Sequence, residues 1–176
     1  YWKHIDRILH ALAYARSAGC DCQLLVAGAG PEKFRLANLV QRLNIANNVI
    51  WLGTVEHKHI WELMNVADVF MITNDVTNRC NPLFEAICAG LPVISVYDPS
   101  TNDILKNGEN ALLANKDDRK GLGENLLRIC SDADLSAKLR YAQQASASNF
   151  LSWAKRMDKE VRELEKLVSE TSCNRK

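Results

Sequence analysis

The chain has 176 residues, a length that fits one domain or one domain with a small appendage. Apolar residues make up 47% of the chain and charged residues 24%, as in an ordinary globular domain. The formal net charge of +1 gives no basis for broad binding to nucleic acid or to acidic partners. No apolar run approaches the ~20 residues of a transmembrane helix, and no signal peptide is recognised at the start of the sequence.

Helical patterns alternate with short apolar runs along the chain. Ile5, Ile8, Leu9 and Leu12 recur at helical spacing and predict a first helix. Five strands are predicted from apolar runs, at residues 23–27, 48–52, 68–73, 92–97 and 110–114. Helices are predicted between them at residues 32–43, 57–66, 82–89 and 99–106, and two or three more follow.

Short strands separated by helices of ~10 residues indicate βαβ units and a parallel sheet. The strands are apolar runs rather than alternating ones, which is typical of a sheet covered on both faces. We therefore predict an α/β fold with a doubly wound, Rossmann-like parallel sheet in a three-layer α/β/α arrangement. Ligands of such sheets bind beyond the carboxyl ends of the strands, so the loops that follow the strands are the places to search.

The predicted domain organisation is a main domain at residues 1–150 and a C-terminal helix with a polar tail at residues 151–176. Because the sequence opens on a helix, we expect that the first strand of the sheet is missing from it. The final helix carries an apolar stripe that predicts a packing face, formed by Trp153, Met157, Val161, Leu164 and Val168.

The six cysteines include no pair with the Cys-x-x-Cys spacing of zinc sites and thioredoxin-like motifs. We expect reduced, mostly buried thiols, and hence a reducing compartment such as the cytoplasm.

The segment from Thr73 to Gly90 carries most of the candidate chemistry. A polar loop follows the predicted strand, and the next helix is expected to begin with Asn81 as N-cap and Pro82 as its first residue. The free N–H groups of a helix N-terminus suit an anion such as a diphosphate. Glu85 lies one turn into this helix, where its carboxylate either stabilises the helix N-terminus or accepts hydrogen bonds from the hydroxyls of a ribose.

A second glycine-containing turn follows the first predicted strand, at residues 28–31. It lacks the third glycine of the dinucleotide-binding fingerprint. We interpret Gly30 as part of a tight strand-to-helix turn near the binding cleft, with contact to a phosphate as the alternative.

Residues 85–93 read Glu-Ala-Ile-Cys-Ala-Gly-Leu-Pro-Val. This run resembles the Glu-Ala-x-x-x-Gly-x-Pro-Val signature of the retaining glycosyltransferases of family 4, which have the GT-B fold. Further motifs similar to those of this family occur in the expected order, at residues 3–6, 26–32, 52–55, 67–70, 107–110 and 150–153. The resemblance covers nearly the whole chain.

The resemblance implies that the chain is the C-terminal half of a GT-B enzyme, which binds a UDP-, GDP- or ADP-sugar as donor. By match, Glu85 holds the ribose, Lys3 contacts the diphosphate and the residues around Val55 meet the base. The loop from Asn78 to Leu83 is implied to present backbone amides to the phosphate and sugar, and its candidate contact residues are Asn78, Arg79, Cys80, Pro82 and Leu83.

The resemblance also implies the remaining partners and the chemistry. The acceptor lies in an N-terminal domain of the same full-length protein, which is missing here, and any peripheral contact with a membrane is expected through that domain. No nucleic acid, metal or other cofactor is expected. Lys3, the helix N-terminus and Arg79 stabilise the charge that develops on the nucleoside diphosphate as it leaves.

This sequence departs from the family pattern at several places, including the first glutamate of the signature. Thr77 stands where the family has the first glutamate of its signature, which contacts the donor sugar, so Thr77 and Asn81 mark the candidate catalytic positions. Asp75 either supplies the absent carboxylate or is an ordinary turn residue. Two alternatives to a transferase stay open: a non-catalytic nucleotide-binding module, which Thr77 favours, and a sugar-nucleotide epimerase or phosphorylase on the same fold.

Overall fold

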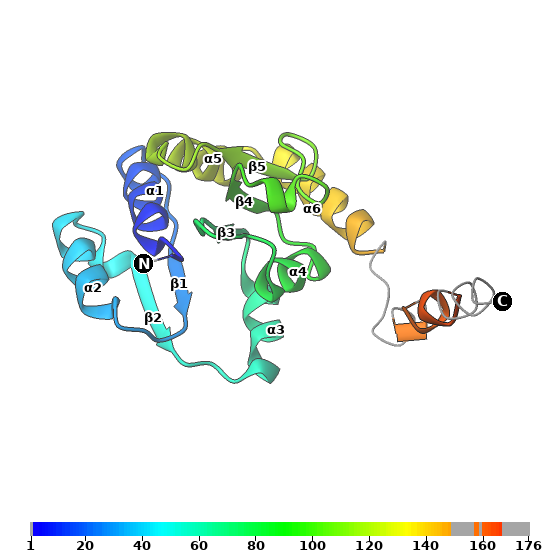
Figure 1. The fold of residues 1–176 in the computed structure, drawn as a ribbon. Coiled ribbons are helices and arrows are strands. Elements are labelled where there is room, and N and C mark those ends of the chain that lie inside the picture. Colours follow the sequence, from blue (N-terminus) through cyan, green and yellow to red (C-terminus); the bar gives the residue numbers. More distant parts are fainter. Residues whose placement is uncertain (1, 149–156, 159, 167–176) are drawn as a thin grey trace.

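The computed structural model describes residues 2–148, 157, 158 and 160–166. Five strands alternate with helices along the chain (Figure 1). The strands are β1 (Leu24–Ala27), β2 (Val49–Gly53), β3 (Phe70–Ile72), β4 (Val93–Val96) and β5 (Ala111–Ala114). The α-helices are α1 (Ile5–Ser17), α2 (Lys33–Arg42), α3 (His57–Val66), α4 (Asn81–Cys88), α5 (Arg119–Ser131) and α6 (Ala133–Ala147).

All strand pairings are parallel, as the alternation of strands and helices predicts. β1 pairs with β2, and β4 lies between β3 and β5. These pairings form two separate sheets, because no pairing among the described residues joins β1 or β2 to the other three strands. All four residues of β4 are buried, as expected for a strand covered on both faces.

Helix α1 packs against both sheets through two apolar faces. Ala11 and Ala15 pack in a core cluster with β4, β5 and α5, whereas Leu9 and Leu12 pack in another with α2 and β2. Small residues let α1 and α5 approach closely, and a Cβ atom added at Gly123 of α5 would lie 2.7 Å from the side chain of Tyr14. The position of α1 is therefore tightly determined on both sides.

Helix α4 is fixed by a third core cluster. Leu83 and Ile87 are fully buried and contact residues of β3, β4 and β5, including Ile72 and Val93. Glu85 lies between these two residues in the helix and is partly exposed, whereas its neighbour Ala86 is fully buried.

Two predicted boundaries were wrong for local reasons. Asn81 is not the N-cap of α4 but its first helical residue, because the N–H groups of Leu83 and Phe84 both donate to the carbonyl of Cys80, which is the capping residue. The helix predicted at residues 99–106 is only a short 3-10 helix at Pro99–Thr101, where the Asp98 side chain accepts a hydrogen bond from the Ser100 amide.

The C-terminal predictions are only partly covered by the described residues. Met157, Val161 and Leu164 are 37%, 47% and 61% exposed, so the predicted packing of this stripe is not observed at these three positions. Trp153, Val168 and the proposed boundary at residue 150 lie outside the described residues.

The expectation of mostly buried thiols was also wrong. Of the cysteines that the structure describes, Cys88 and Cys130 are exposed and Cys20, Cys22 and Cys80 are half-buried, all as free thiols. None of the helices in the described ranges has the length and apolar character needed to cross a membrane.

Candidate functional site

The carboxyl ends of β1 and β2 meet in a pair of glycine turns. The amide of Gly28 donates to the carbonyl of Gly53 at 2.7 Å, and both residues have positive φ angles, of 127° and 66°. Such angles favour glycine, which has no Cβ atom to clash with the backbone. Gly30 is exposed just beyond the first turn, and Val55 is half-buried just beyond the second. The structure thus brings these two predicted residues to neighbouring strand ends.

Glu85 is paired with the loop that follows β2. Its Oε1 lies 3.0 Å from Nε2 of His57, the first residue of α3. The Glu85 side chain is 26% exposed and that of His57 is 88% exposed, so the carboxylate remains accessible from outside. This contact places Glu85 next to the segment that contains Val55, which joins the residues predicted to meet the ribose and the base.

The loop between β3 and α4 is held from inside by a buried carboxylate. Asp98, which follows β4, accepts hydrogen bonds from the backbone N–H of Asn78 at 2.6 Å and from its Nδ2 at 3.0 Å. Asn78 Oδ1 in turn accepts from the amide of Asn74 at 2.8 Å. Asn78 is fully buried, so its amide is used inside the protein and does not face a ligand. The Asn78 amide is thus engaged by Asp98 in this structure, and its contact with the donor stays a prediction.

The hydrogen bonds around Asp98 also determine its ionisation. Burial raises the pKa of its carboxyl group, but the hydrogen bonds from the backbone and side chains of Ser100 and Asn78 outweigh burial and keep this pKa below its usual range. Asp98 is therefore an ionised anchor for the loop at neutral pH.

Thr77 and Arg79 connect the same loop to the segment after β4. Thr77 Oγ1 lies 2.8 Å from Ser100 Oγ and accepts a hydrogen bond from the amide of Arg79. The Arg79 guanidinium donates to both carboxylate oxygens of Asp103, at 2.8 and 2.9 Å, and stands over the ring of Phe84. This pairing lowers the pKa of Asp103. The charge of Arg79 is thus already matched by a carboxylate of the chain.

The remaining residues of the predicted loop differ in what they offer a ligand. Asn81 and Pro82 are exposed at the start of α4, and Cys80 is half-buried. Leu83 is fully buried in the core, and its amide donates to the carbonyl of Cys80. Both the side chain and the amide of Leu83 are thus engaged within the fold, and its contact with the donor stays a prediction.

Lys3 lies at the start of α1 and is exposed, with its ammonium 5.5 Å from the centre of the Trp2 ring. The residues around it contact the loop after β3. The Asp75 amide donates to the Trp2 carbonyl at 2.9 Å, and the Thr73 hydroxyl donates to the His4 carbonyl at 2.9 Å. Lys3 and the β3–α4 loop therefore lie at the same edge of the sheet.

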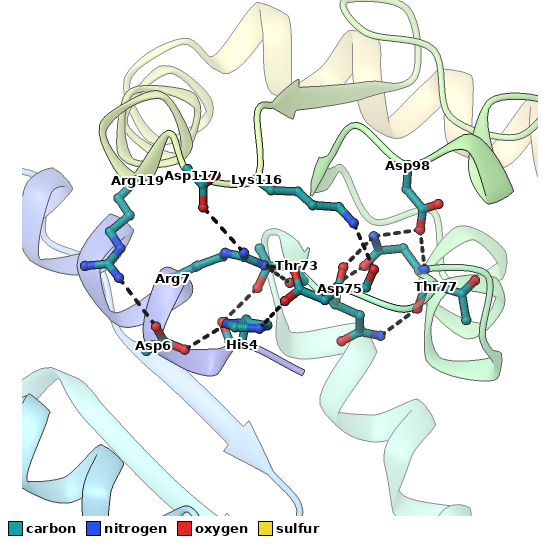
Figure 2. Close-up of polar contacts among 12 residues, drawn as sticks. His4, Asp6, Arg7, Thr73, Asp75, Thr77, Asp98, Lys116, Asp117 and Arg119 are labelled. Atoms are coloured by element: carbon teal, nitrogen blue, oxygen red, sulfur yellow. Dashed lines mark hydrogen bonds and ion pairs between the residues drawn. The ribbon is translucent and has the colours of Figure 1, made fainter. Parts of the chain in front are cut away.

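Charged side chains from three segments converge around Asp75 (Figure 2). Arg7 of α1 donates to the Thr73 carbonyl at 3.0 Å and to Oδ1 of Asp75 at 2.7 Å. The imidazole of His4 contacts the other carboxylate oxygen of Asp75. Lys116, from the loop after β5, donates to the Asp75 carbonyl at 2.8 Å.

The sequence analysis did not identify Arg7 as part of the site. A signal was nevertheless present, because Arg7 is four residues before Ala11 and eight before Ala15, and so stands on the same apolar stripe of α1. A charged side chain that is buried on an apolar helix face needs a partner of opposite charge. Here that partner is Asp75, and the Arg7 side chain is only 9% exposed.

No group of three or more His, Cys, Asp or Glu side chains that could hold a metal ion occurs among the residues described by the structure. The site instead offers the ammonium group of the exposed Lys3 and the N–H groups at the exposed start of α4. The carboxylate of Glu85 can accept hydrogen bonds from hydroxyl groups.

Comparison with known proteins shows where this arrangement belongs. The model of the family described as glycosyl transferases group 1 matches residues 1–146. The chain belongs to this family. The predicted family and the Rossmann-like fold are therefore confirmed.

Among curated relatives, a 2-deoxystreptamine N-acetyl-D-glucosaminyltransferase of Niallia circulans is 26% identical over 132 residues, which cover 74% of this chain and 34% of the relative. An N-acetyl-alpha-D-glucosaminyl L-malate synthase of Bacillus anthracis is 25% identical over 65% of this chain and 30% of its own length. The chain thus spans about a third of the length of these relatives.

Solved structures share the fold. TarM of S. aureus superposes with a TM-score of 0.83 at 15% identity, over 92% of this chain and 33% of TarM. HepE of Anabaena, crystallised with UDP, superposes with a TM-score of 0.80 at 22% identity, over 94% of this chain and 46% of HepE. At these identities the likeness concerns the fold.

Proposed function

We propose that this chain binds the nucleoside-diphosphate sugar of a retaining glycosyltransferase, and that an acceptor held by another domain of the full-length protein receives the glycosyl group. The observation that carries the proposal is the pairing of Glu85 with His57. It sets an accessible carboxylate beside the segment after β2, on a chain whose family consists of glycosyltransferases.

Glu85 is the proposed ribose-binding residue. A carboxylate offers two oxygens, which accept hydrogen bonds from two neighbouring hydroxyl groups. His57 occupies one oxygen at 3.0 Å and holds the carboxylate in place, and the 26% exposure of Glu85 leaves room for a ligand. The base is then expected near Val55, which precedes His57 in the same segment.

Lys3 is the proposed diphosphate-binding residue. An ammonium group binds phosphate well as a point charge, and no described carboxylate pairs with Lys3, in contrast to Arg79. We therefore assign the stabilisation of the leaving nucleoside diphosphate to Lys3 and the exposed start of α4, and propose no metal for this step.

The alternative of a non-catalytic nucleotide-binding module is favoured by Thr77. This residue replaces an acidic side chain of the family pattern, and its hydroxyl contacts Ser100. The two proposals share nucleotide binding and differ in glycosyl transfer. In either case, a cytoplasmic protein with membrane contact only through its other domain is our proposal for its location.

Calorimetric titration of the chain with UDP, GDP and ADP tests the binding proposal. We expect one nucleotide to bind selectively and Glu85→Ala to weaken it at least about tenfold, since the lost hydrogen bonds reach a charged acceptor. Glu109→Ala is the matched control, because Glu109 is exposed in the turn that precedes β5, at the opposite edge of the sheet. Absence of binding by all three nucleotides, or equal effects of the two substitutions, would refute the proposal.

A second assay separates the transferase from the non-catalytic module. The full-length protein is incubated with the sugar conjugate of the nucleotide that binds, and release of the free nucleoside diphosphate is followed. Release that is abolished by Glu85→Ala supports the transferase. Tight binding with no release, with or without candidate acceptors, supports the module.

A further inference from the structure

The position of Lys3 depends on contacts made by its neighbours. Its own ammonium contacts the Trp2 ring, and no ion pair of Lys3 with a carboxylate occurs in the described part of the chain. Lys3 also precedes the first residue of α1, so helical hydrogen bonding does not fix it. Where its side chain points is therefore set by the backbone of the residues on either side.

Asp75 holds both of those residues. Its amide donates to the carbonyl of Trp2 at 2.9 Å, and its carboxylate contacts the imidazole of His4. His4 has a φ angle of 46°, in the left-handed region that residues with a Cβ atom rarely adopt. This conformation turns the chain sharply between Lys3 and α1, and it needs tertiary contacts to persist.

Asp75 is itself fixed from two further segments. Arg7 of α1 donates to its Oδ1 at 2.7 Å, and Lys116 donates to its carbonyl at 2.8 Å (Figure 2). The Arg7 side chain is 9% exposed, so this ion pair is largely shielded from water on the arginine side. The hydrogen bond from Arg7 lowers the pKa of Asp75, which keeps the carboxylate ionised at neutral pH.

We propose that Asp75 is a positioning residue, which holds Lys3 where it binds the diphosphate of the donor. The inference rests on the function proposed above and extends it to a residue outside the signature. Asp75 acts through Lys3 rather than on the sugar, because both of its carboxylate oxygens already contact cationic or imidazole groups, Arg7 and His4.

A comparison of the diphosphate with its nucleoside isolates this role. The nucleotide selected by the titration (UDP, GDP or ADP) and its nucleoside are titrated against the same chain. Only the affinity for the diphosphate depends on Lys3, whereas the affinities for both ligands depend on Glu85. We expect Asp75→Asn to weaken the diphosphate about tenfold and to change the affinity for the nucleoside less than about twofold.

Two further variants connect the effect to Lys3. Lys3→Ala is expected to weaken the diphosphate to a similar extent, and Asp75→Asn added to Lys3→Ala is expected to have no further effect, because the residue it positions is gone. Asp21→Asn is the control, since Asp21 is 97% exposed and pairs with Arg16 at the far end of α1. It should alter neither affinity.

His4→Asn provides the same test if Asp75→Asn reduces the stability of the fold. Asparagine tolerates the left-handed conformation of this position, and the ion pair between Arg7 and Asp75 stays in place. His4→Asn is expected to lower the affinity for the diphosphate but not for the nucleoside, with an unchanged far-UV circular dichroism spectrum.

The outcomes distinguish the two proposals. If no nucleotide binds, the proposed function is refuted and the positioning role of Asp75 with it. The positioning role is refuted, and the proposed function stands, if the diphosphate binds but Asp75→Asn and His4→Asn leave its affinity unchanged. The same conclusion follows if these substitutions lower the affinity for the nucleoside equally, or if their effects on diphosphate affinity add fully to that of Lys3→Ala.

Discussion

Replacement of Asp98 by alanine tests whether one buried carboxylate holds the loop between β3 and α4. The carboxylate accepts from the Asn78 amide at 2.6 Å, from Asn78 Nδ2 at 3.0 Å and from the Ser100 amide at 2.9 Å. Asn78 is fully buried, so its backbone N–H and one hydrogen of its Nδ2 find no water after the substitution, while the other Nδ2 hydrogen keeps the Asn74 carbonyl at 3.3 Å. Ser100 is half-buried, and its amide can be hydrated.

The expected loss of stability follows from those donors. Each buried donor left without a partner costs about 1–3 kcal/mol, so the two donors of Asn78 together predict a loss of about 3 kcal/mol for Asp98→Ala. For a chain of this size, that loss corresponds to a decrease in the unfolding midpoint of roughly 6–12 °C.

The loss should also depend on pH. The pKa of Asp98 in the folded protein is below its ordinary value, so its contribution to stability is fully present above the unfolded pKa of ~4 and is lost as the pH falls through the folded value. The difference between Asp98→Ala and the unmodified chain should therefore shrink below about pH 4.

Urea denaturation followed by circular dichroism, at neutral pH and at about pH 3, measures both effects. Asp103→Ala is the control, because its carboxylate bridges the same two segments from the surface and should leave the midpoint nearly unchanged. A loss below ~0.5 kcal/mol at neutral pH would refute the reasoning, as would a loss of equal size at both pH values.

Three further predictions concern other parts of the fold. Gly123→Ala should lower the free energy of unfolding by about 1–3 kcal/mol, because the added Cβ would lie 2.7 Å from the Tyr14 side chain. Gly30→Ala is the control, because its added Cβ meets no atom within 4 Å and should change this free energy little. Equal effects of the two substitutions in urea denaturation would contradict the α1–α5 packing. Asn110→Ala should cost about 2 kcal/mol, because its side chain accepts from the Lys106 amide at 2.7 Å and donates to the Ile104 carbonyl at 2.8 Å; an unchanged urea midpoint would show that these bonds contribute nothing net. Cys130 is exposed as a residue, but partial burial of its thiol group and the neighbouring Cys20 raise the pKa of this thiol to about 12. Iodoacetamide should therefore alkylate Cys130 at pH 8 roughly a thousandfold more slowly than free cysteine, with a rate that rises with pH. A rate within tenfold of free cysteine, measured by mass spectrometry, would contradict the raised pKa.

The order of the elements was predictable because strands and helices carry local patterns. The apolar run at residues 92–97 contains β4 (Val93–Val96), and the helix predicted at residues 57–66 has the same bounds as α3. Such patterns reflect which side chains are buried within a few residues of each other. Where the pattern is weak, at residues 99–106, only the short 3-10 helix at Pro99–Thr101 forms, and the Asp98 side chain caps its start.

The contacts of the site were much harder to predict. Glu85 was identified as a candidate, but its pairing with His57 joins residues 28 positions apart. Asn78 was expected to offer its amide to a ligand, and a carboxylate 20 positions further along the chain accepts it instead. Nothing in the local sequence specifies which loops will meet at the edge of a sheet.

The sequence by itself determined the family, the alternation of parallel strands with helices and the candidate status of Lys3 and Glu85, because these depend on motifs and on local periodicity. Only the tertiary structure decided that Arg79 is paired with Asp103 and that Arg7 and Asp75 form an ion pair beside Lys3. The physical reason is that ion pairs and hydrogen bonds depend on distances of about 3 Å between side chains. Those distances are fixed only when the sheet has brought segments 66–68 residues apart, such as those of Arg7, Thr73 and Asp75, to one edge.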